Sequence, residues 1–489
     1  MAEFAAGRVV VGKEQAGPTR ASDADQGVLL RCGGRPTEVI GDKAETPRRI
    51  SALQARLPAP RRTGLVSRSA VACCVFSAVA SAQQQVTFYR DVLPVLQEHC
   101  QACHRRGEIA PMPLGTYEEA RPWARAIREQ VMKRAMPPWF GESAVLRFSS
   151  DPRLSEEQIQ TLAAWADAGA PAGDSRDAPP PRQWAEGWNI DAPDVVVQMP
   201  KAVDLPASGD VDYTYVIVPS GFREDRWISQ AEIRPSDRRV VHHAVVYIRE
   251  PGSDWLRSAP VGVPFTARTL KDAKGQADAK WTDSDLLLVY APGSLPDRWP
   301  EGMAKLVKAG SDLVFQMHYT TRGVPVHDRT SIGLVFAKQA PVKRVLSLQL
   351  TNDRFLIPPG VASYTAHVFG TMPGDALLLN LFPHLHFRGK SFTYVATLPG
   401  GKPQVLLKVN WSFEWQMSYR LAEPMLLPAG TRLEAIAEWD NSRNNPHNPD
   451  PESAVSWGEQ TWQEMMVGFF DIGVDPWLDK KAFFAQRKR

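Results

Sequence analysis

The chain carries two histidines, His384 and His386, one residue apart in the apolar run FPHLHFRGK. In a β-strand, residues i and i+2 project from the same face, so both imidazoles can reach one metal ion. A second group comprises the adjacent His242 and His243, in VVHHAVVYI, and His318, in FQMHY. Adjacent strand residues point to opposite faces, so His242 and His243 can share a metal only where the strand bulges or ends.

Each histidine pair is followed, at a similar distance along the chain, by a third possible ligand. His318 follows the first pair, and Met465, in TWQEMMVGF, follows the second. Imidazole nitrogen and thioether sulfur are ligands that suit copper. No cysteine follows Cys103, which excludes a blue-copper site, a Cys-ligated zinc site or an iron–sulfur cluster in the rest of the chain. We expect the neighbouring Met466 to pack in the core.

A further motif is Cys100-Gln-Ala-Cys103-His104, which has the C-x-x-C-H pattern of covalent haem c attachment. Each cysteine would form a thioether to the haem, and His104 would bind the iron. A methionine on a loop is the expected sixth ligand. Met136 is favoured because the following prolines hold its loop extended, and Met112 is the alternative.

The elements around this motif are expected to be helical. Thr116-x-x-Glu119 and Ser155-x-x-Gln158 have the pattern of helix-capping boxes. Residues 86–172 therefore predict a small all-α cytochrome c-like domain. Upstream, basic residues, a short apolar run and Ala80-Ser81-Ala82 predict a secretion signal cleaved near Ala82, so residues 1–82 would be leader and signal. This predicts a periplasmic or secreted protein, and the apolar run is shorter than the roughly 20 residues of a membrane span.

Residues 173–194 are rich in proline and polar residues and predict a linker. Beyond them, alternating apolar runs separated by turn residues predict β-sandwiches, with one domain at 195–345 and a second at 346–475. The net charge of +3 is small for 489 residues and suggests no nucleic-acid partner.

These motifs resemble those of the copper type II, ascorbate-dependent monooxygenases, the peptidylglycine α-hydroxylating and dopamine β-monooxygenase group. The resemblance covers about residues 195–475. It implies a multidomain chain in which the all-α cytochrome c-like domain precedes two all-β jelly-roll-like sandwich domains, with two copper ions and one covalent haem c as cofactors. The implied ligands of the first copper are His242, His243 and His318, and those of the second are His384, His386 and Met465.

The resemblance also implies roles and limits. Gln316 matches a family position between the two coppers and is assigned a relay or positioning role. The positions that hold a peptide carboxylate in the family are here the apolar Phe382, Val467 and Phe469. An unpaired buried carboxylate is costly, so a non-peptide substrate is expected.

The implied activity is hydroxylation of a C–H bond of an unknown small organic substrate with O2. Electrons would come through the tethered haem from ascorbate or a periplasmic redox protein. Two alternatives stay open: a non-catalytic haem and copper electron-transfer or copper-binding protein, and a zinc hydrolase, which three histidines could support but for which no H-E-x-x-H motif is present.

Overall fold

The computed structural model describes residues 85–108, 110–184, 187–266, 284–291, 294–480 and 483. All of them belong to one compact unit. The leader and signal predicted for residues 1–82 lie outside these ranges. Among the described residues, no helix is long and apolar enough to cross a membrane.

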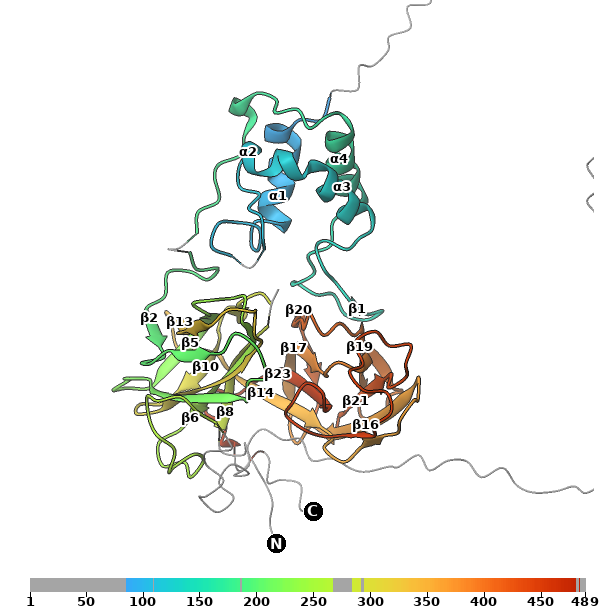
Figure 1. Ribbon diagram of the computed structural model, residues 1–489. Coiled ribbons are helices and arrows are strands. Elements are labelled where there is room, and N and C mark those ends of the chain that lie inside the picture. Colours follow the sequence, from blue (N-terminus) through green and yellow to red (C-terminus); the bar gives the residue numbers. More distant parts are fainter. Residues whose placement is uncertain are drawn as a thin grey trace, which may run out of the picture. The chain divides into compact units, whose positions relative to one another are not determined.

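A helical segment opens the described chain, and its α-helices gather together in Figure 1. Ser155 caps the last of them with the predicted reciprocal capping box, in which Gln158 is the partner. Thr116 caps another through the Glu119 amide, while the Glu119 carboxylate accepts from the Gly115 amide. The bounds are α1 Leu93–His99, α2 Tyr117–Ala120, α3 Ala124–Met132 and α4 Glu156–Asp167, with a π-helical turn at Phe88–Val92 and 3-10 turns at Arg121–Trp123 and Ser175–Asp177.

The N-terminal β half packs two layers around an apolar core. One layer is the five-stranded sheet β7-β4-β11-β6-β8, and the other is formed by β2-β13-β5-β10. The strands are β2 Val195–Gln198, β3 Val203–Leu205, β4 Thr214–Pro219, β5 Arg226–Arg234, β6 Val241–Arg249, β7 Phe265–Thr266, β8 Ser284–Tyr290, β9 Asp297–Arg298, β10 Met303–Val307, β11 Asp312–Tyr319, β12 Val326–Asp328 and β13 Ser331–Phe336.

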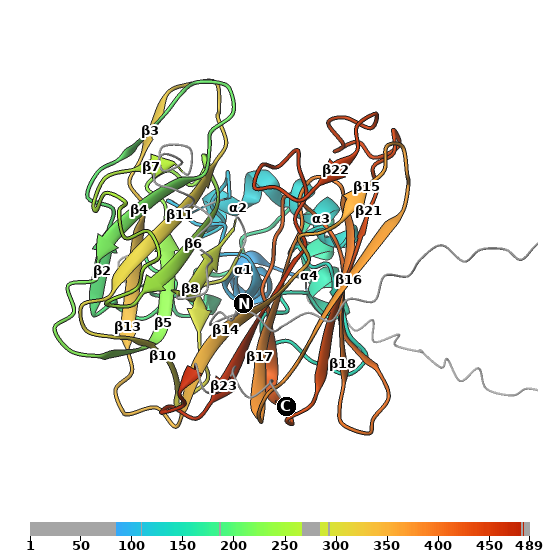
Figure 2. The same cartoon turned by 90° about the horizontal axis from the view of Figure 1, so that it is seen from below.

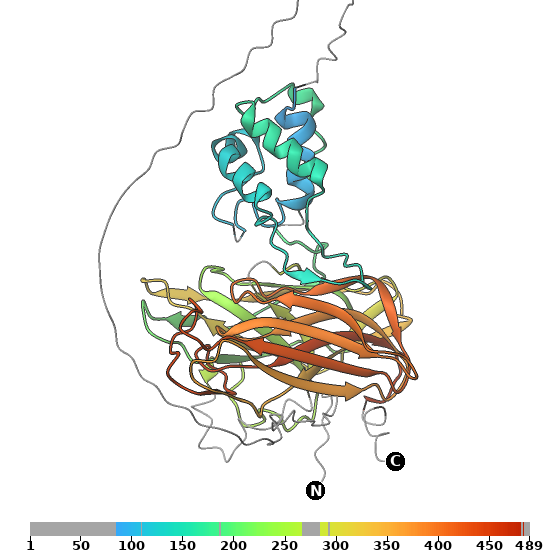
Figure 3. The same ribbon diagram turned by 90° about the vertical axis from the view of Figure 1, so that its right-hand side faces the viewer.

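The C-terminal β half has the same two-layer plan around its own core. Strands β14-β23-β17-β20 make one layer and β1-β19-β18-β21-β16 the other. Figure 2 shows β14, β23 and β17 side by side, and Figure 3 shows the long strands of this half. The strands are β14 Lys343–Thr351, β15 Leu356–Ile357, β16 Tyr364–Thr371, β17 Ala376–His384, β18 Gly389–Thr397, β19 Gln404–Asn410, β20 Tyr419–Leu427, β21 Arg432–Trp439, β22 Val455–Ser456 and β23 Val467–Val474, with β1 at Gly141–Glu142.

The predicted fold class was wrong for the helical segment. The described chain is mostly β-sheet, and its short helices do not form an all-α cytochrome c-like domain: the same segment contributes β1, whose Gly141 pairs with Val409 of β19. A further bridge joins Phe148 to Leu421. The segment therefore uses the edge of the C-terminal sheet, which would otherwise stay unpaired.

The two β halves share one sheet. Strands β10 and β14 pair in parallel, with Met303 opposite Lys343, so a single nine-stranded sheet runs through both halves. The predicted boundary at residues 345 and 346 falls inside β14. Periodicity along a strand shows which face is buried, but it does not show which strand completes each edge.

Candidate metal centre

The three-histidine cluster is formed by His242, His243 and His318, whose ligand atoms all lie within 4.8 Å of one another. The Nδ1 atom of His243 is 3.3 Å from that of His242 and 3.3 Å from that of His318. Three nitrogens that converge in this way offer lone pairs to one ion. The donor set is the imidazole set that suits copper or zinc.

A β-bulge makes this arrangement possible. Along the β6–β11 pair, His318 lies opposite His243 and Tyr319 lies opposite Val241, so His242 is the extra residue. The extra residue removes the strict alternation that would send adjacent side chains to opposite faces. The condition stated for His242 and His243 to share a metal is therefore met.

The cluster lies on the face of the five-stranded sheet that points away from the sandwich core. His243 and His318 alternate with Ala244 and Met317, which belong to that core. On the outer face, the hydroxyl of Tyr213 is 3.1 Å from Nε2 of His243. The Tyr213 ring also stacks on His318, with centroids 4.8 Å apart and planes 8° apart.

Tyr213 therefore fixes the orientation of the His243 ring. An imidazole that binds a metal through Nδ1 carries its proton on Nε2, and this N–H can donate to the Tyr213 oxygen. No sequence motif pointed to Tyr213. Its only signal was the alternation of tyrosines in VDYTYVIV, which places Tyr213 and Tyr215 on one strand face.

The second pair, His384 and His386, presents the opposite nitrogen. Nδ1 of His384 is 2.7 Å from Oε1 of Gln416, and Nδ1 of His386 is 3.2 Å from the carbonyl oxygen of Gln463. These acceptors place the proton on Nδ1 and leave the Nε2 lone pair free in both rings. His386 is fully buried, and its Nε2 has no hydrogen-bond partner. A buried nitrogen without a partner is expected where a metal ion binds.

A buried carboxylate holds the turn that carries His386. Glu464 accepts from the backbone amides of His386, at 2.9 Å, and Arg388, at 2.7 Å. It also accepts from the indole of Trp439 at 3.0 Å. Burial raises the pKa of Glu464 to about 7 against these hydrogen bonds. Glu464 thus connects the turn that carries His386 to Met465, the next residue in the chain.

Met465 follows Glu464 and lies at the same end of the sheet as the histidine pair. Strands β17 and β23 are antiparallel neighbours in which His384 is opposite Val467. Met465 is 6% exposed and lies outside the apolar core of this half, whereas Met466 is fully buried within it. The expectation that Met466 packs in the core is confirmed, and Met465 remains the candidate thioether ligand.

The two histidine groups meet. The ring centroids of His243 and His384 are 5.5 Å apart, and those of His384 and His386 are 5.2 Å apart. The five imidazoles thus form one continuous cluster. Burial is the main cause that lowers the pKa of His242 to about 4, of His318 to about 3 and of His384 to about 4. Burial and the neighbouring rings also lower the pKa of His243 and His386. At neutral pH all five rings are uncharged, as metal ligation requires.

Gln316 lies on β11 two residues before His318, on the same face. Its amide nitrogen donates to the Tyr215 hydroxyl at 2.6 Å, and its oxygen accepts from the Tyr247 hydroxyl at 3.4 Å. Both of these contacts are with tyrosines. The relay or positioning role assigned to Gln316 stays a prediction.

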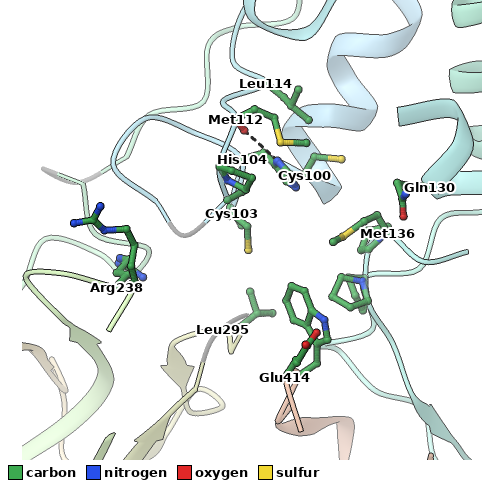
Figure 4. A pocket seen from close by; sticks show the side chains of 18 of the residues that line it. Cys100, Cys103, His104, Met112, Leu114, Gln130, Met136, Arg238, Leu295 and Glu414 are labelled. Atoms are coloured by element: carbon green, nitrogen blue, oxygen red, sulfur yellow. Dashed lines mark hydrogen bonds between the residues drawn. The ribbon is translucent and has the colours of Figure 1, made fainter. Parts of the chain in front are cut away.

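The haem-attachment motif lines a cavity of about 710 Å³. Nδ1 of His104 donates to the carbonyl oxygen of Met112 at 3.1 Å, which leaves Nε2 free for iron. Figure 4 shows Met112 beside His104 and Cys100, with Met136 across the cavity. Met136 would be the candidate second ligand of a haem iron held by His104, because Met112 lies on the same side of the cavity as His104. Two thiols, a tautomer-fixed histidine and a cavity of this size together fit a covalent haem.

The remaining histidines contact other groups. His327 and His367 lie near Asp204 and Glu434 on the surface, and His99 contacts the Pro152 carbonyl and the Gln158 side chain. The Phe382 and Phe469 rings stack with centroids 5.9 Å apart, and Val467 is buried, so the positions that hold a carboxylate in the resembled family form an apolar wall here.

Comparisons with known proteins identify no family. No model of a protein family matches the chain, and no curated protein matches it. Among solved structures, PNGF-II in the P21 space group matches with a TM-score of 0.22 at 11% identity, covering 57% of this chain and 60% of that one. The VP2 subviral particle of infectious bursal disease virus matches with a TM-score of 0.16 at 9% identity, covering 60% and 73%. The chain thus spans less than two thirds of PNGF-II, and TM-scores this low carry no argument.

Proposed function

We propose that this protein is a secreted or periplasmic copper-dependent monooxygenase that receives electrons through a covalent haem. The observation that carries the proposal is a cluster of five neutral imidazoles, four of them buried and His242 half-buried, with two kinds of free nitrogen. Nδ1 atoms converge in one group, and the buried Nε2 of His386 lacks a partner in the other. Met465 would complete the second group with a soft ligand.

The overall reaction would convert a C–H bond and O2, with two electrons and two protons, into an alcohol and water. Copper at the histidines would supply electron storage and O2 reduction, and haem at Cys100 and Cys103 would supply single electrons. The side chains of the protein have distinct tasks. Gln416 and the Gln463 carbonyl hold two imidazoles in the Nδ1–H tautomer. The apolar wall of Phe382 and Phe469 favours a substrate without a carboxylate.

Metal analysis tests this proposal most directly. Protein matured with haem attachment and loaded with copper should contain about two copper and one iron per chain. Zinc that replaces copper under competition would overturn the copper assignment.

The axial haem ligand has its own test. In oxidised protein, Met136→Ala should remove the iron–sulfur charge-transfer band at the red end of the visible spectrum, because the band requires a bound thioether. Met112→Ala is the matched control and should keep it. Loss of the band in Met112→Ala alone would reverse the assignment.

One observation favours a second candidate, a non-catalytic electron-transfer or copper-binding protein. The rings of His243 and His384 nearly touch, and the void beside Phe382 and Phe469 measures about 30 Å³, room for a water molecule but not for an organic substrate. Reductant-dependent O2 uptake separates the two readings. Uptake coupled to a hydroxylated product supports the monooxygenase, and uptake no faster than that of free copper supports the carrier.

A further inference from the structure

The two walls of the haem cavity differ in charge. The wall from the helical segment is apolar except for Gln130, Ser150 and the two histidines His99 and His104; none of its residues is an aspartate, glutamate, lysine or arginine. The wall from the β-rich part carries Arg238, Arg239, Arg322 and Glu414, together with His242. Among the described lining residues, every fixed positive charge therefore comes from the β-rich part.

A haem brings two carboxylates into this cavity. A carboxylate taken out of water without a partner is costly, and an arginine guanidinium is the side chain best shaped to pair with it. The helical wall offers no such partner. Glu414 would repel a carboxylate, so the carboxylate edge of the haem should turn toward the arginines.

The three arginines are not equally available. Arg239 is exposed and already paired with Asp237, at 2.9 and 2.5 Å. Nη2 of Arg238 is 3.2 Å from the Glu108 carboxylate without hydrogen-bond geometry, and the Arg238 guanidinium also interacts with the Tyr290 hydroxyl. Arg322 is exposed like Arg239, but its Nε donates to the Arg239 carbonyl at 2.7 Å and it forms no salt bridge with an acidic side chain in the described ranges.

The Glu108 carboxylate holds the Arg238 side chain in position. This carboxylate follows the haem-attachment motif, is almost fully buried, and also pairs with Arg105 and Arg234 at 2.7 Å each. Three arginines thus surround one glutamate, and Glu232 is a second carboxylate that pairs with Arg234 and Arg238. A haem carboxylate would offset the excess positive charge of this group.

We propose that Arg238 and Arg322 bind the two carboxylates of the haem attached at Cys100 and Cys103. The β-rich part then completes a haem site that the helical segment leaves without charge partners. The inference rests on the proposed function only in requiring a haem. His242 lines the same cavity as the two arginines, so they would hold the carboxylates on the wall that also carries part of the three-histidine cluster.

The test is the midpoint potential of the haem in the mature, copper-loaded protein, measured by spectroelectrochemistry from about pH 4.5 to 8. Arg322→Gln and Arg238→Gln should each lower the potential, because loss of a nearby cation favours oxidised haem. The freed carboxylate should also regain an ordinary pKa, so the potential should acquire a new pH dependence at about pH 4 to 6. Arg322→Lys should keep most of the charge effect.

Controls and contrary outcomes are distinct. Arg257→Gln removes the same charge from an exposed arginine that does not line the cavity, and it should leave the potential and its pH profile unchanged. The other titratable groups on the walls are Glu414, His99, His104 and His242, and they are common to all variants. If Arg238→Gln fails to fold, Arg322→Gln decides. Wild-type potentials and pH profiles in the glutamine variants overturn this inference while the proposed function stands, and absence of covalent haem overturns both.

Discussion

The two histidine groups bring their imidazole rings together through different backbone structures. His243 and His318 face each other across paired strands, and a bulge adds His242. In the second group His384 is the last residue of β17, and His386 lies on the turn beyond it. The first group presents Nδ1 atoms and the second leaves Nε2 atoms free.

The difference teaches how each site would keep its geometry. Strand pairing fixes the first group, so its rings need only an orienting contact such as Tyr213. The turn of the second group has no strand partner, and the buried Glu464 holds its amides instead. The first group should therefore be robust and suited to repeated electron storage. The second should depend on a few hydrogen bonds and on Met465.

The largest expected effect comes from removing one ligand of each group. Met465→Ala should lower substrate oxidation at least about 100-fold while copper at the three-histidine cluster stays reducible. His318→Ala should lower oxidation equally but leave the second copper in place. Electron paramagnetic resonance of copper, with product measured in parallel, separates the two patterns.

Met466→Leu is the matched control for Met465→Ala. It preserves volume in the core and should keep activity near the wild-type value. Full activity in Met465→Ala would mean that the histidine pair is not half of an oxygen site.

Glu464→Gln should have the next largest effect and should act on the second group alone. A glutamine can accept through one oxygen only, while both carboxylate oxygens are used in the protein. We expect copper affinity at the His384 and His386 pair to fall about 10- to 100-fold. Copper titration should show one weakened and one unchanged site. Glu438 is a partly exposed carboxylate paired with Lys390, so Glu438→Gln should change the copper affinity of neither site.

Tyr213→Phe should give a smaller change in the first group. The substitution removes the hydroxyl near Nε2 of His243 but keeps the ring that stacks on His318. Copper affinity there should fall about 10-fold, with the second site unaffected. Gln416→Leu is the equivalent substitution in the second group, because it removes the hydrogen-bond partner of Nδ1 in His384. Equal weakening of both sites in either variant would contradict the separation of the two groups.

The last substitution, Asp297→Asn, lies near the junction of the two β halves and should leave copper binding unchanged. Burial, with a smaller contribution from Asp471, raises the pKa of Asp297 from its usual 3.8 to about 6 although Arg420 lies nearby. Between about pH 4 and 6 the folded protein then binds more protons than the unfolded chain. The unfolding free energy should therefore fall as pH rises through this window, by at most about 3 kcal/mol. Asp297→Asn should flatten this dependence in denaturant unfolding, and an unchanged slope would contradict it.

Local patterns in the sequence carried much of the candidate site. The H-x-H spacing predicted two rings on one strand face; the rings of His384 and His386 do lie with centroids 5.2 Å apart, but β17 ends at His384 and His386 lies beyond it. The Ser155 capping box and the core position of Met466 were predicted correctly. These features depend on alternation and capping rules that act over a few residues. The copper, haem and oxygenase assignments remain predictions.

Contacts between distant segments could not be read in the same way. The His242 bulge, the approach of His243 to His384, and the parallel pairing of β10 with β14 join residues far apart in the chain. For the same reason the prediction of an all-α domain was wrong. Short-range periodicity shows which side of a strand or helix is buried. It does not show which other segment packs there, because that depends on how the edges and faces of all the sheets are covered at once. That is why Tyr213, Gln416 and Arg322 became visible only once the strands were assembled.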